Sequence, residues 1–181
     1  VGSHVGYFSR CFADNNPGGL VLAFEPQSVP RSVATVASFF RKQRNIVQFP
    51  FALGRESGLL DLKIPIKAKG GIGIGLAHVG PADDLADRFD VRREIVPCDT
   101  LDNVLSRISI ARLSLIKIDV EGGELDVLRG ASNTLAHYKP TVVCETTPQS
   151  MQRFGDSVSG LREFMAGLGY SARDLDTGKA L

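Results

Sequence analysis

Short apolar runs alternate with stretches of helical periodicity along most of the chain. Four of these runs are bounded by polar or turn-forming residues and lie at residues 20–24, 45–49, 113–118 and 141–144. A short continuous apolar run is typical of a strand that is buried on both faces of a parallel sheet. Successive strand-helix steps therefore predict an α/β fold with a mostly parallel sheet.

The stretches between these runs carry apolar residues at the spacing of a helix face. They cover residues 6–13, 28–43, 100–108, 123–137 and 158–168. In the second stretch we expect Val33, Val36 and Phe40 to face the core. Ser28 and Thr100 are the expected N-terminal caps of the second and third helices. Residues 170–175 are predicted to form a last strand.

The middle of the chain is less regular. Residues 59–66 and 92–97 are expected to be extended, and residues 81–89 are expected to form a short helix. The glycine-rich residues 70–75 lack the Lys-Ser/Thr ending of a P-loop, which favours a mobile surface loop over a phosphate cradle. We interpret residues 1–181 as a single domain with a variable insertion at about 55–98, which is expected to form part of the substrate pocket or a lid.

Composition excludes several classes of function. Lys and Arg total 21 against 20 Asp and Glu, so no strong field favours nucleic acid or an anionic membrane surface. Three widely spaced cysteines suggest neither disulfides nor a zinc site, and Cys98 and Cys144 are expected to be small core residues. No apolar run approaches the ~18 residues of a membrane-spanning helix. Without a signal peptide at its start, the chain is expected to be cytoplasmic.

The start of the chain suggests a missing element. Residues 2–6 have the glycines of a turn that leads from a strand into a helix, and only Val1 is left to supply that strand. We therefore expect the sequence to be a piece of a longer parent protein, with the first strand of the sheet largely missing.

Acidic residues follow three of the predicted strands. Glu25 follows the first, Asp119 and Glu121 follow the third, and Glu145 follows the fourth. The carboxyl ends of parallel strands meet at one edge of a sheet, where ligands bind. An acid about 20 residues beyond a glycine turn commonly binds a ribose, and Glu25 lies 19 residues beyond Gly6. The pattern predicts a site for a nucleotide-like cofactor.

Structural roles are the alternative for several of these residues. Glycines at such turns often serve only the backbone, and Glu124 with Asp126 is expected to interact with a helix dipole at the surface. For His4, local hydrogen bonding and catalysis both stay open. Lys117 shares the strand face of Asp119 and points either to the site or into a buried pair.

The central motif resembles the signature of a known family. Residues 115–124, LIKIDVEGGE, followed by VLRGA at 127–131, are similar to the FkbM-type S-adenosylmethionine-dependent methyltransferases. Supporting pieces occur in the expected order: the turn at 1–9, Phe24-Glu25-Pro26, Ala52-Leu53-Gly54 and Thr100-Leu101-Asp102. The resemblance covers nearly the whole chain.

This resemblance implies a Rossmann-like class I methyltransferase sheet with helices on both faces, and S-adenosylmethionine as the cofactor. It also implies O-methylation of a hydroxyl on a sugar or natural product. The implied cofactor-binding residues are Gly2, Ser3, His4, Gly6, Glu25, Pro26, Ala52 and Asp119. The implied catalytic residues are Asp119, Glu121, Glu145 and His4.

Other functions stay open at this point. The carboxylates could serve as a general base or could hold Mg²⁺, which would acidify a bound hydroxyl. A nicotinamide-dependent oxidoreductase is an alternative enzyme, although residues 2–6 lack the full G-x-G-x-x-G spacing. A non-catalytic binding domain of the same fold is the second alternative function. The expected partner is a small-molecule or glycan acceptor, and we expect the protein to bind neither nucleic acid nor a membrane.

Overall fold

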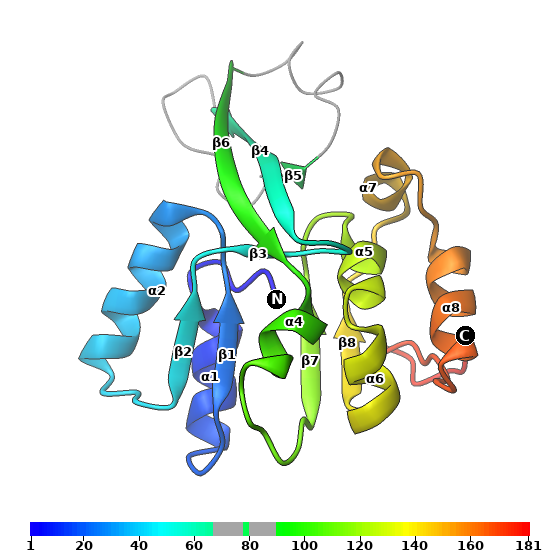
Figure 1. The fold of residues 1–181 in the computed structure, drawn as a ribbon, viewed down its shortest axis with the longest axis horizontal. Coiled ribbons are helices and arrows are strands. Elements are labelled where there is room, and N and C mark those ends of the chain that lie inside the picture. Colours follow the sequence, from blue (N-terminus) through cyan, green and yellow to red (C-terminus); the bar gives the residue numbers. More distant parts are fainter. Residues whose placement is uncertain (67–77, 80–89) are drawn as a thin grey trace.

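A computed structural model describes residues 1–66, 78–79 and 90–181 of the protein (Figure 1). The helices are α1 (Tyr7–Asn15), α2 (Ser28–Phe40), α4 (Leu101–Ser106), α5 (Glu124–Arg129), α6 (Ser132–Tyr138), α7 (Pro148–Arg153) and α8 (Val158–Gly167). The strands are β1 (Val21–Phe24), β2 (Ile46–Phe49), β3 (Ala52–Leu53), β4 (Gly58–Ile66), β5 (His78–Val79), β6 (Asp90–Asp99), β7 (Leu115–Ile118) and β8 (Thr141–Cys144). The mixture confirms an α/β fold.

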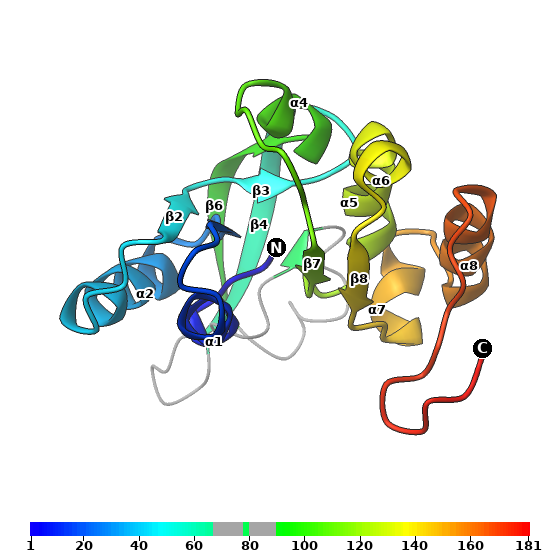
Figure 2. The same ribbon diagram turned by 90° about the horizontal axis from the view of Figure 1, so that it is seen from below.

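The strands predicted to form one parallel sheet are divided between two small sheets. β1 pairs in parallel with β2, and β7 pairs in parallel with β8. Figure 1 shows β1 and β7 as neighbours that point the same way, and Figure 2 shows α4 and α6 on one side of these strands and α1 on the other. The predicted single sheet is not observed, because no described strand pairs with both β1 and β7.

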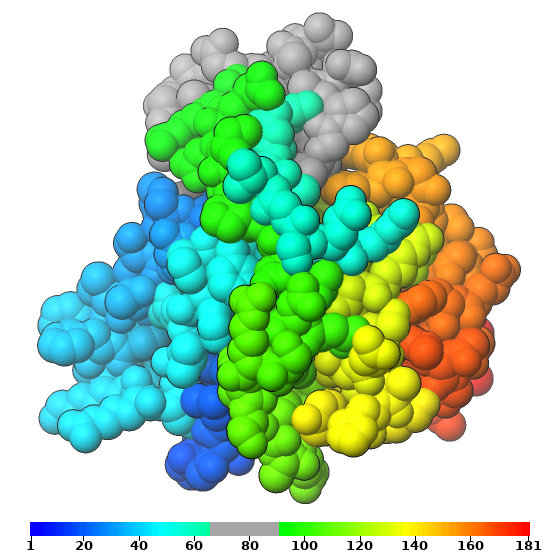
Figure 3. Space-filling view, in the orientation of Figure 1, coloured from blue at the N-terminus to red at the C-terminus, as the bar shows by residue number. Residues whose placement is uncertain are grey.

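The predicted extended segments in the middle of the chain form an arm. β4 and β6 pair antiparallel over nine residue pairs, and the full sheet has the order β3-β6-β4-β5. Leu62, Ile64 and Val96 make a small apolar cluster on this arm. Figure 1 shows the arm above the layer of parallel strands, and Figure 3 shows its cyan and green residues above those of α4. The glycine run at 70–75 and the predicted helix at 81–89 lie outside the described residues.

The main core joins β7 to the helices that follow it. Ile116 and Ile118 of β7 are buried together with the α5 residues Leu125 and Leu128, and Leu135 of α6 is fully buried. These residues belong to the apolar run at 113–118 and to the helical stretch at 123–137 that the sequence pattern predicted. Thr100 caps α4 as predicted, because its side chain accepts a hydrogen bond from the Asn103 N–H at 3.0 Å.

The predicted inner face of α2 is wrong. Val33, Val36 and Phe40 are exposed, Phe40 by 78% of its surface, while Ala34 and Ser38 are buried. Small side chains let this helix approach its neighbours closely, so the larger apolar residues are left on the outside. Gln27, not Ser28, is the N-cap residue, and it makes no side-chain capping hydrogen bond.

The predicted helix at 123–137 is two helices, α5 and α6. The break lies at Gly130, where an added Cβ would come within 2.0 Å of the Gly54 carbonyl oxygen. The Gly130 carbonyl accepts a hydrogen bond from the Asp102 N–H at 3.0 Å instead of continuing a helix. Close packing against two other segments therefore ends α5.

The carboxyl-terminal region contains one helix more and one strand fewer than predicted. α8 lies where expected, with Ser157 as its cap, and α7 was not predicted. Residues 170–175 form no strand, and the described pairing there is a single bridge between Arg173 and Ala180. Among the described helices, none is long and apolar enough to cross a membrane.

Candidate active site

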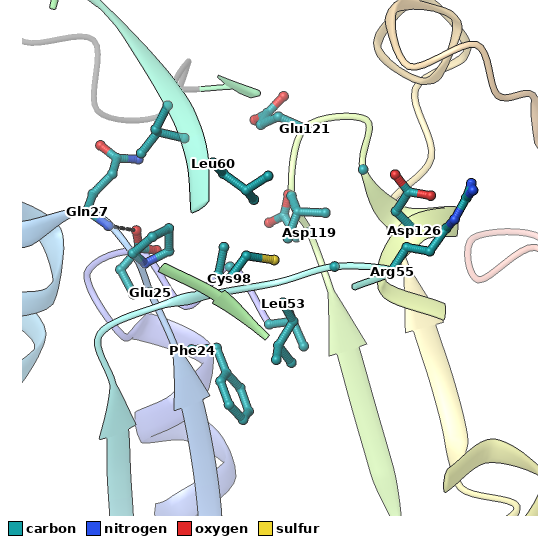
Figure 4. Close-up of a pocket in the computed structure, with 18 of the residues that line it drawn as sticks. Phe24, Glu25, Gln27, Leu53, Arg55, Leu60, Cys98, Asp119, Glu121 and Asp126 are labelled. Carbon is teal, nitrogen blue, oxygen red and sulfur yellow. Dashed lines mark hydrogen bonds between the residues drawn. The ribbon is translucent and has the colours of Figure 1, made fainter. Parts of the chain in front are cut away.

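A cavity of about 660 Å³ opens at the carboxyl ends of β1 and β7, beneath the arm (Figure 4). Its lining comes from segments far apart in the chain: the amino-terminal turn, the ends of β1 and β3, strands β4 and β6, the loop after β7, and α7 with the residue that follows it. In Figure 4, Glu25 lies on one side of this cavity, and Asp119 with Glu121 lies on the other. Carboxylates therefore face the same space from two sides.

Glu25 is buried at the end of β1, with only 4% of its surface exposed. Its Oε2 accepts a hydrogen bond from the His4 N–H at 2.7 Å, and its Oε1 accepts one from the Gln27 N–H at 2.9 Å. Burial raises the pKa of Glu25, and these two backbone donors oppose that shift. Since a carboxylate oxygen has two lone pairs, each Glu25 oxygen can accept one more hydrogen bond.

The amino-terminal turn connects the two sides of the cavity. The Ser3 N–H donates to the Phe24 carbonyl at 2.9 Å, and the Val1 amino group donates to the Lys117 carbonyl at 2.7 Å. Gly2 has a φ of +69° and lies so close to the residue after β7 that an added Cβ would be 1.8 Å from the Asp119 carbonyl oxygen. Only glycine fits this position.

We expect Gly2→Ala to lower the free energy of unfolding by about 2 kcal/mol or more, since it combines a left-handed backbone with a backbone clash. Gly18→Ala is the matched control, because a Cβ at Gly18 meets no atom within 4 Å. The control should change stability by less than about 0.5 kcal/mol. Urea titration followed by circular dichroism measures both, and equal effects of the two substitutions would contradict the close approach at Gly2.

The Val1 amino group is enclosed between β1 and β7 when Val1 is the first residue. Burial and, to a smaller extent, the nearby Lys117 charge lower its pKa to about 5. Between pH 8 and about 5 the unfolded amine binds a proton that the folded amine does not bind. The free energy of unfolding should therefore fall as the pH is lowered through this range.

The control for this prediction is the same chain with an acetylated amino group. Glu25 and Glu121 titrate in both proteins, so the difference between their stability curves isolates the Val1 amine. We expect the acetylated chain to gain relative stability as the pH falls from 8 to 5. Parallel curves in urea titrations across this range would contradict the prediction.

Glu124 stabilises the loop after β7 through hydrogen bonds to its backbone. The Oε1 of Glu124 accepts hydrogen bonds from the Val120 N–H at 3.2 Å and from the Gly122 N–H at 3.0 Å. Glu124 is only 2% exposed, so the expectation that it lies at the surface is wrong. It stabilises the turn in which Glu121 has a left-handed φ of +58°.

The two carboxylates on this loop have different surroundings. Asp119 Oδ2 lies 2.5 Å from Lys117 Nζ, in an ion pair whose lysine is largely buried. Glu121 makes no hydrogen bond or ion pair with any residue that the structure describes. Burial raises the pKa of Glu121, and the negative charges of Asp119, Glu145 and Glu124 raise it further.

The structure brings most of the predicted site residues together. Those that line the cavity are Gly2, His4, Glu25, Pro26, Ala52, Asp119 and Glu121. Ser3, Gly6 and Glu145 do not line it. The Glu145 side chain is exposed next to the cavity, and its charge reaches Glu121. The His4 backbone N–H donates to Glu25, and the role of the His4 imidazole stays a prediction.

Several lining residues were missed by sequence reasoning. Arg55 and Asp126 lie close together at one end of the cavity, as Figure 4 shows, and Arg153 with Phe154 lines the cavity as well. They come from separate segments whose spacing in the sequence carries no signal. Gly54 could have been a guide to Arg55, because it marks the turn that follows the short strand β3.

The thiols of Cys98 and Cys144 are poor nucleophiles. Burial raises the pKa of Cys98, which lines the cavity, to about 11, and it raises that of Cys144 to about 12. Because the thiolate is the reactive form, neither residue is suited to covalent catalysis. Both cysteines are packed among apolar residues, as expected. Within the ranges that the structure describes, no group of three or more His, Cys, Asp or Glu side chains could hold a metal ion.

Comparison with known proteins gave two findings. A model of the FkbM methyltransferase domain matches residues 1–172. The fold is similar to the crystal structure of a methyltransferase FkbM from Methylobacillus flagellatus KT, with a TM-score of 0.53 and 16% sequence identity. That match covers 79% of this chain but only 30% of the other, and at this identity it shows the fold alone. No curated protein matches the chain.

Proposed function

Because the chain belongs to the FkbM methyltransferase family, as its motifs predicted, we propose that it transfers a methyl group from S-adenosylmethionine to a hydroxyl of a sugar or natural product. The observation that carries this proposal is the single cavity with Glu25 on one side and Asp119 with Glu121 on the other. The first position suits the ribose of the cofactor, and the second suits the reacting hydroxyl.

The residues around the cavity fit this cofactor. Glu25 keeps a free acceptor position on each oxygen for the two ribose hydroxyls. Phe24, Ala52 and Leu53 from one side and Leu60 with Leu62 from the arm provide an apolar wall of the kind that suits an adenine ring. The cavity volume of about 660 Å³ is within the range for small-molecule sites. When bound, S-adenosylmethionine would supply an electrophilic methyl group.

Glu121 is the residue best suited to accept the proton of the acceptor hydroxyl. A general base must be free to bind that proton and should have a pKa closer to the working pH than an ordinary carboxylate. Glu121 has no partner among the described residues and has a raised pKa, whereas Asp119 is engaged by Lys117. Holding the acceptor oxygen in line with the methyl group would supply much of the remaining acceleration.

The far end of the cavity favours a polyhydroxylated acceptor. Arg55 and Arg153 provide hydrogen-bond donors, while Glu56 and Asp126 provide acceptors, and Phe154 adds an apolar surface. A sugar presents hydroxyl groups that both donate and accept. This mixed lining supports a glycan or another hydroxyl-rich molecule as the acceptor.

Calorimetry with S-adenosylmethionine on the full-length protein tests the cofactor, and the absence of binding would overturn the proposal. Titration with NADH in the same experiment separates it from the nicotinamide-dependent alternative. Transfer of a labelled methyl group to a panel of sugars separates it from a binding domain without catalysis. Repeating the transfer assay with a chelator tests the Mg²⁺ alternative, which predicts loss of activity.

A further inference from the structure

The outer face of α2 is apolar. Figures 1 and 2 show this helix at the edge of the molecule, beside β2 and away from β7 and β8. Its buried side contains the small residues Ala34 and Ser38, which pack against the rest of the fold. Its outer side exposes large apolar side chains by 41–78% of their surface: Val29, Val33, Val36, Phe39 and Phe40. We call these five residues the α2 patch.

The α2 patch is continuous along the helix. Four of its residues recur at intervals of four, three and four positions, which is the spacing of one stripe on a helix, and Phe39 lies beside the end of this stripe. The charged residue within α2, Arg31, is half-buried and donates hydrogen bonds to two backbone carbonyls in front of the helix. No charge therefore interrupts the patch.

The exposed apolar surface is large. An aromatic side chain carries about 150–250 Å², so Phe39 and Phe40, each 78% exposed, together present roughly 230–390 Å². The three valines add to this surface. Contiguous exposed apolar patches of this size mark sites that interact with proteins or membranes.

Basic residues follow the α2 patch directly. Arg41, Lys42 and Arg44 come after the last phenylalanine, and all three are exposed. Arg41 lies 3.7 Å from Asp14 in an ion pair. The side chains of Lys42 and Arg44 make no hydrogen bond or ion pair with any residue that the structure describes. Cations at a helix end also interact with its dipole, but that role requires no exposed apolar neighbours.

The size, charge and shape of this surface argue against two other occupants. A stable dimer buries about 800 Å² on each partner, at least about twice the surface of the two phenylalanines. Two copies packed through α2 would leave their basic residues without acidic partners, because the first turn of α2 contains no acid. A peptide that docks as a helix needs a groove, whereas a single helix at the edge of the molecule is convex.

We propose that the α2 patch docks the protein on an anionic lipid membrane, with α2 lying in the plane of the interface. Helices of this kind insert apolar and aromatic side chains at the boundary of the lipid tails and keep basic residues beside negative headgroups. The 13 residues of α2 are about 20 Å long, too short to cross a hydrocarbon core of about 30 Å.

This proposal replaces an expectation that rested on the charge of the whole chain. The balance of 21 basic against 20 acidic residues hides a local cluster beside an apolar face. Docking at α2 also holds the cavity near the membrane, since Gln27, the N-cap residue of α2, lines that cavity. None of the patch residues lines it, so the proposal stands or falls independently of the proposed methyl transfer.

Tryptophan fluorescence tests the docking at the patch itself. The sequence contains no tryptophan, so Phe40→Trp places a single reporter in the patch, and Leu175→Trp places one at an equally exposed control site. With vesicles of phosphatidylcholine containing about 30% phosphatidylserine, we expect a blue shift and quenching by brominated lipid for Phe40→Trp alone. Vesicles of pure phosphatidylcholine should bind the protein at least about 10-fold more weakly.

Substitutions of the apolar residues test the inserted surface by co-sedimentation with the same anionic vesicles. Phe39→Ser combined with Phe40→Ser should weaken binding at least about 10-fold, because the apolar area is lost. Leu175→Ser is the matched control and should leave binding unchanged. These side chains are exposed, so the melting temperature should stay close to that of the natural protein.

Substitutions of the basic residues test the contact with the headgroups. Lys42→Gln combined with Arg44→Gln should weaken binding to the anionic vesicles at least about 10-fold. The matched control is Arg162→Gln combined with Arg173→Gln, which removes two exposed charges at the opposite side of the molecule and should have little effect.

Four outcomes would overturn the proposal. The first is no binding of the natural protein to the anionic vesicles at about 0.1 M salt. The second is equal binding by the natural protein and by the variant without Phe39 and Phe40. The third is an equal shift for Leu175→Trp, which assigns the binding to another surface. The fourth is a dimer that the double serine variant dissociates, which assigns the α2 patch to a second copy.

Discussion

Replacing Glu25 with alanine is expected to weaken the binding of S-adenosylmethionine by about 10²- to 10⁴-fold. The carboxylate is proposed to accept hydrogen bonds from both ribose hydroxyls, and a hydrogen bond to a charged group contributes about 1.5–3 kcal/mol. Since about 1.4 kcal/mol corresponds to a tenfold change in affinity, two such bonds account for the expected loss. Calorimetry with the purified variant measures it.

The same substitution affects the protein without its cofactor, because Glu25 also holds the His4 and Gln27 N–H groups. Alanine leaves both donors without their partner, so the melting temperature should fall as well. Glu25→Gln separates the two effects, because glutamine keeps the shape of the side chain and one acceptor oxygen. This variant should bind the cofactor more weakly than the natural protein, but its melting temperature should lie closer to that of the natural protein than the melting temperature of Glu25→Ala does. Glu163→Ala, on the exposed side of α8, is the control for a carboxylate far from the cavity. Unchanged affinity in a folded Glu25→Ala protein would remove Glu25 from the ribose site.

Replacing Glu121 with glutamine is expected to lower kcat by about 10²- to 10⁴-fold, which is the usual contribution of a general base. The dissociation constant of S-adenosylmethionine should change by less than about threefold, because Glu121 is proposed to act on the acceptor. Glutamine has nearly the same shape but cannot take up the proton. Single-turnover methyl transfer gives the rate, and calorimetry gives the affinity.

The pH profile adds a second readout for Glu121. Its raised pKa means that the base becomes competent only as the pH rises above the ordinary range of a glutamate. The rate should therefore increase with pH through that raised pKa, and the Glu121→Gln variant should lack this limb.

Glu145→Gln tests the other acid next to the cavity. Its charge helps to raise the pKa of Glu121, so its removal should move the acidic limb to lower pH and leave the plateau rate in place. If kcat instead falls with Glu145→Gln and not with Glu121→Gln, the assignment of the base is reversed.

The sequence allowed the strands and most helices to be predicted, because each has a local signature. β7 and α8 lie where their apolar spacing placed them, and the cap at Thr100 follows from a side chain that bonds three residues ahead. The family was also readable from the sequence, since its central motif is a continuous segment. The acids at strand ends were found for the same reason.

Predictions failed where a residue depends on a neighbour that is distant in the chain. The exposed face of α2 has the same spacing as a buried face, so the pattern alone did not show which side Ala34 would pack on. Gly130 ends α5 because of contacts with Gly54 and Asp102. Glu124 looked like a surface acid, and only the folded loop shows that it holds the Val120 and Gly122 N–H groups.

What the sequence determined by itself is the set of elements, the family, and the acids at the ends of β1 and β7, because periodicity and motifs act over a few residues. What only the tertiary structure decided is the cavity between Glu25 and Glu121 and the arrangement of the arm above it. These features depend on which segments pack together, and the spacing of residues along the chain does not record that packing.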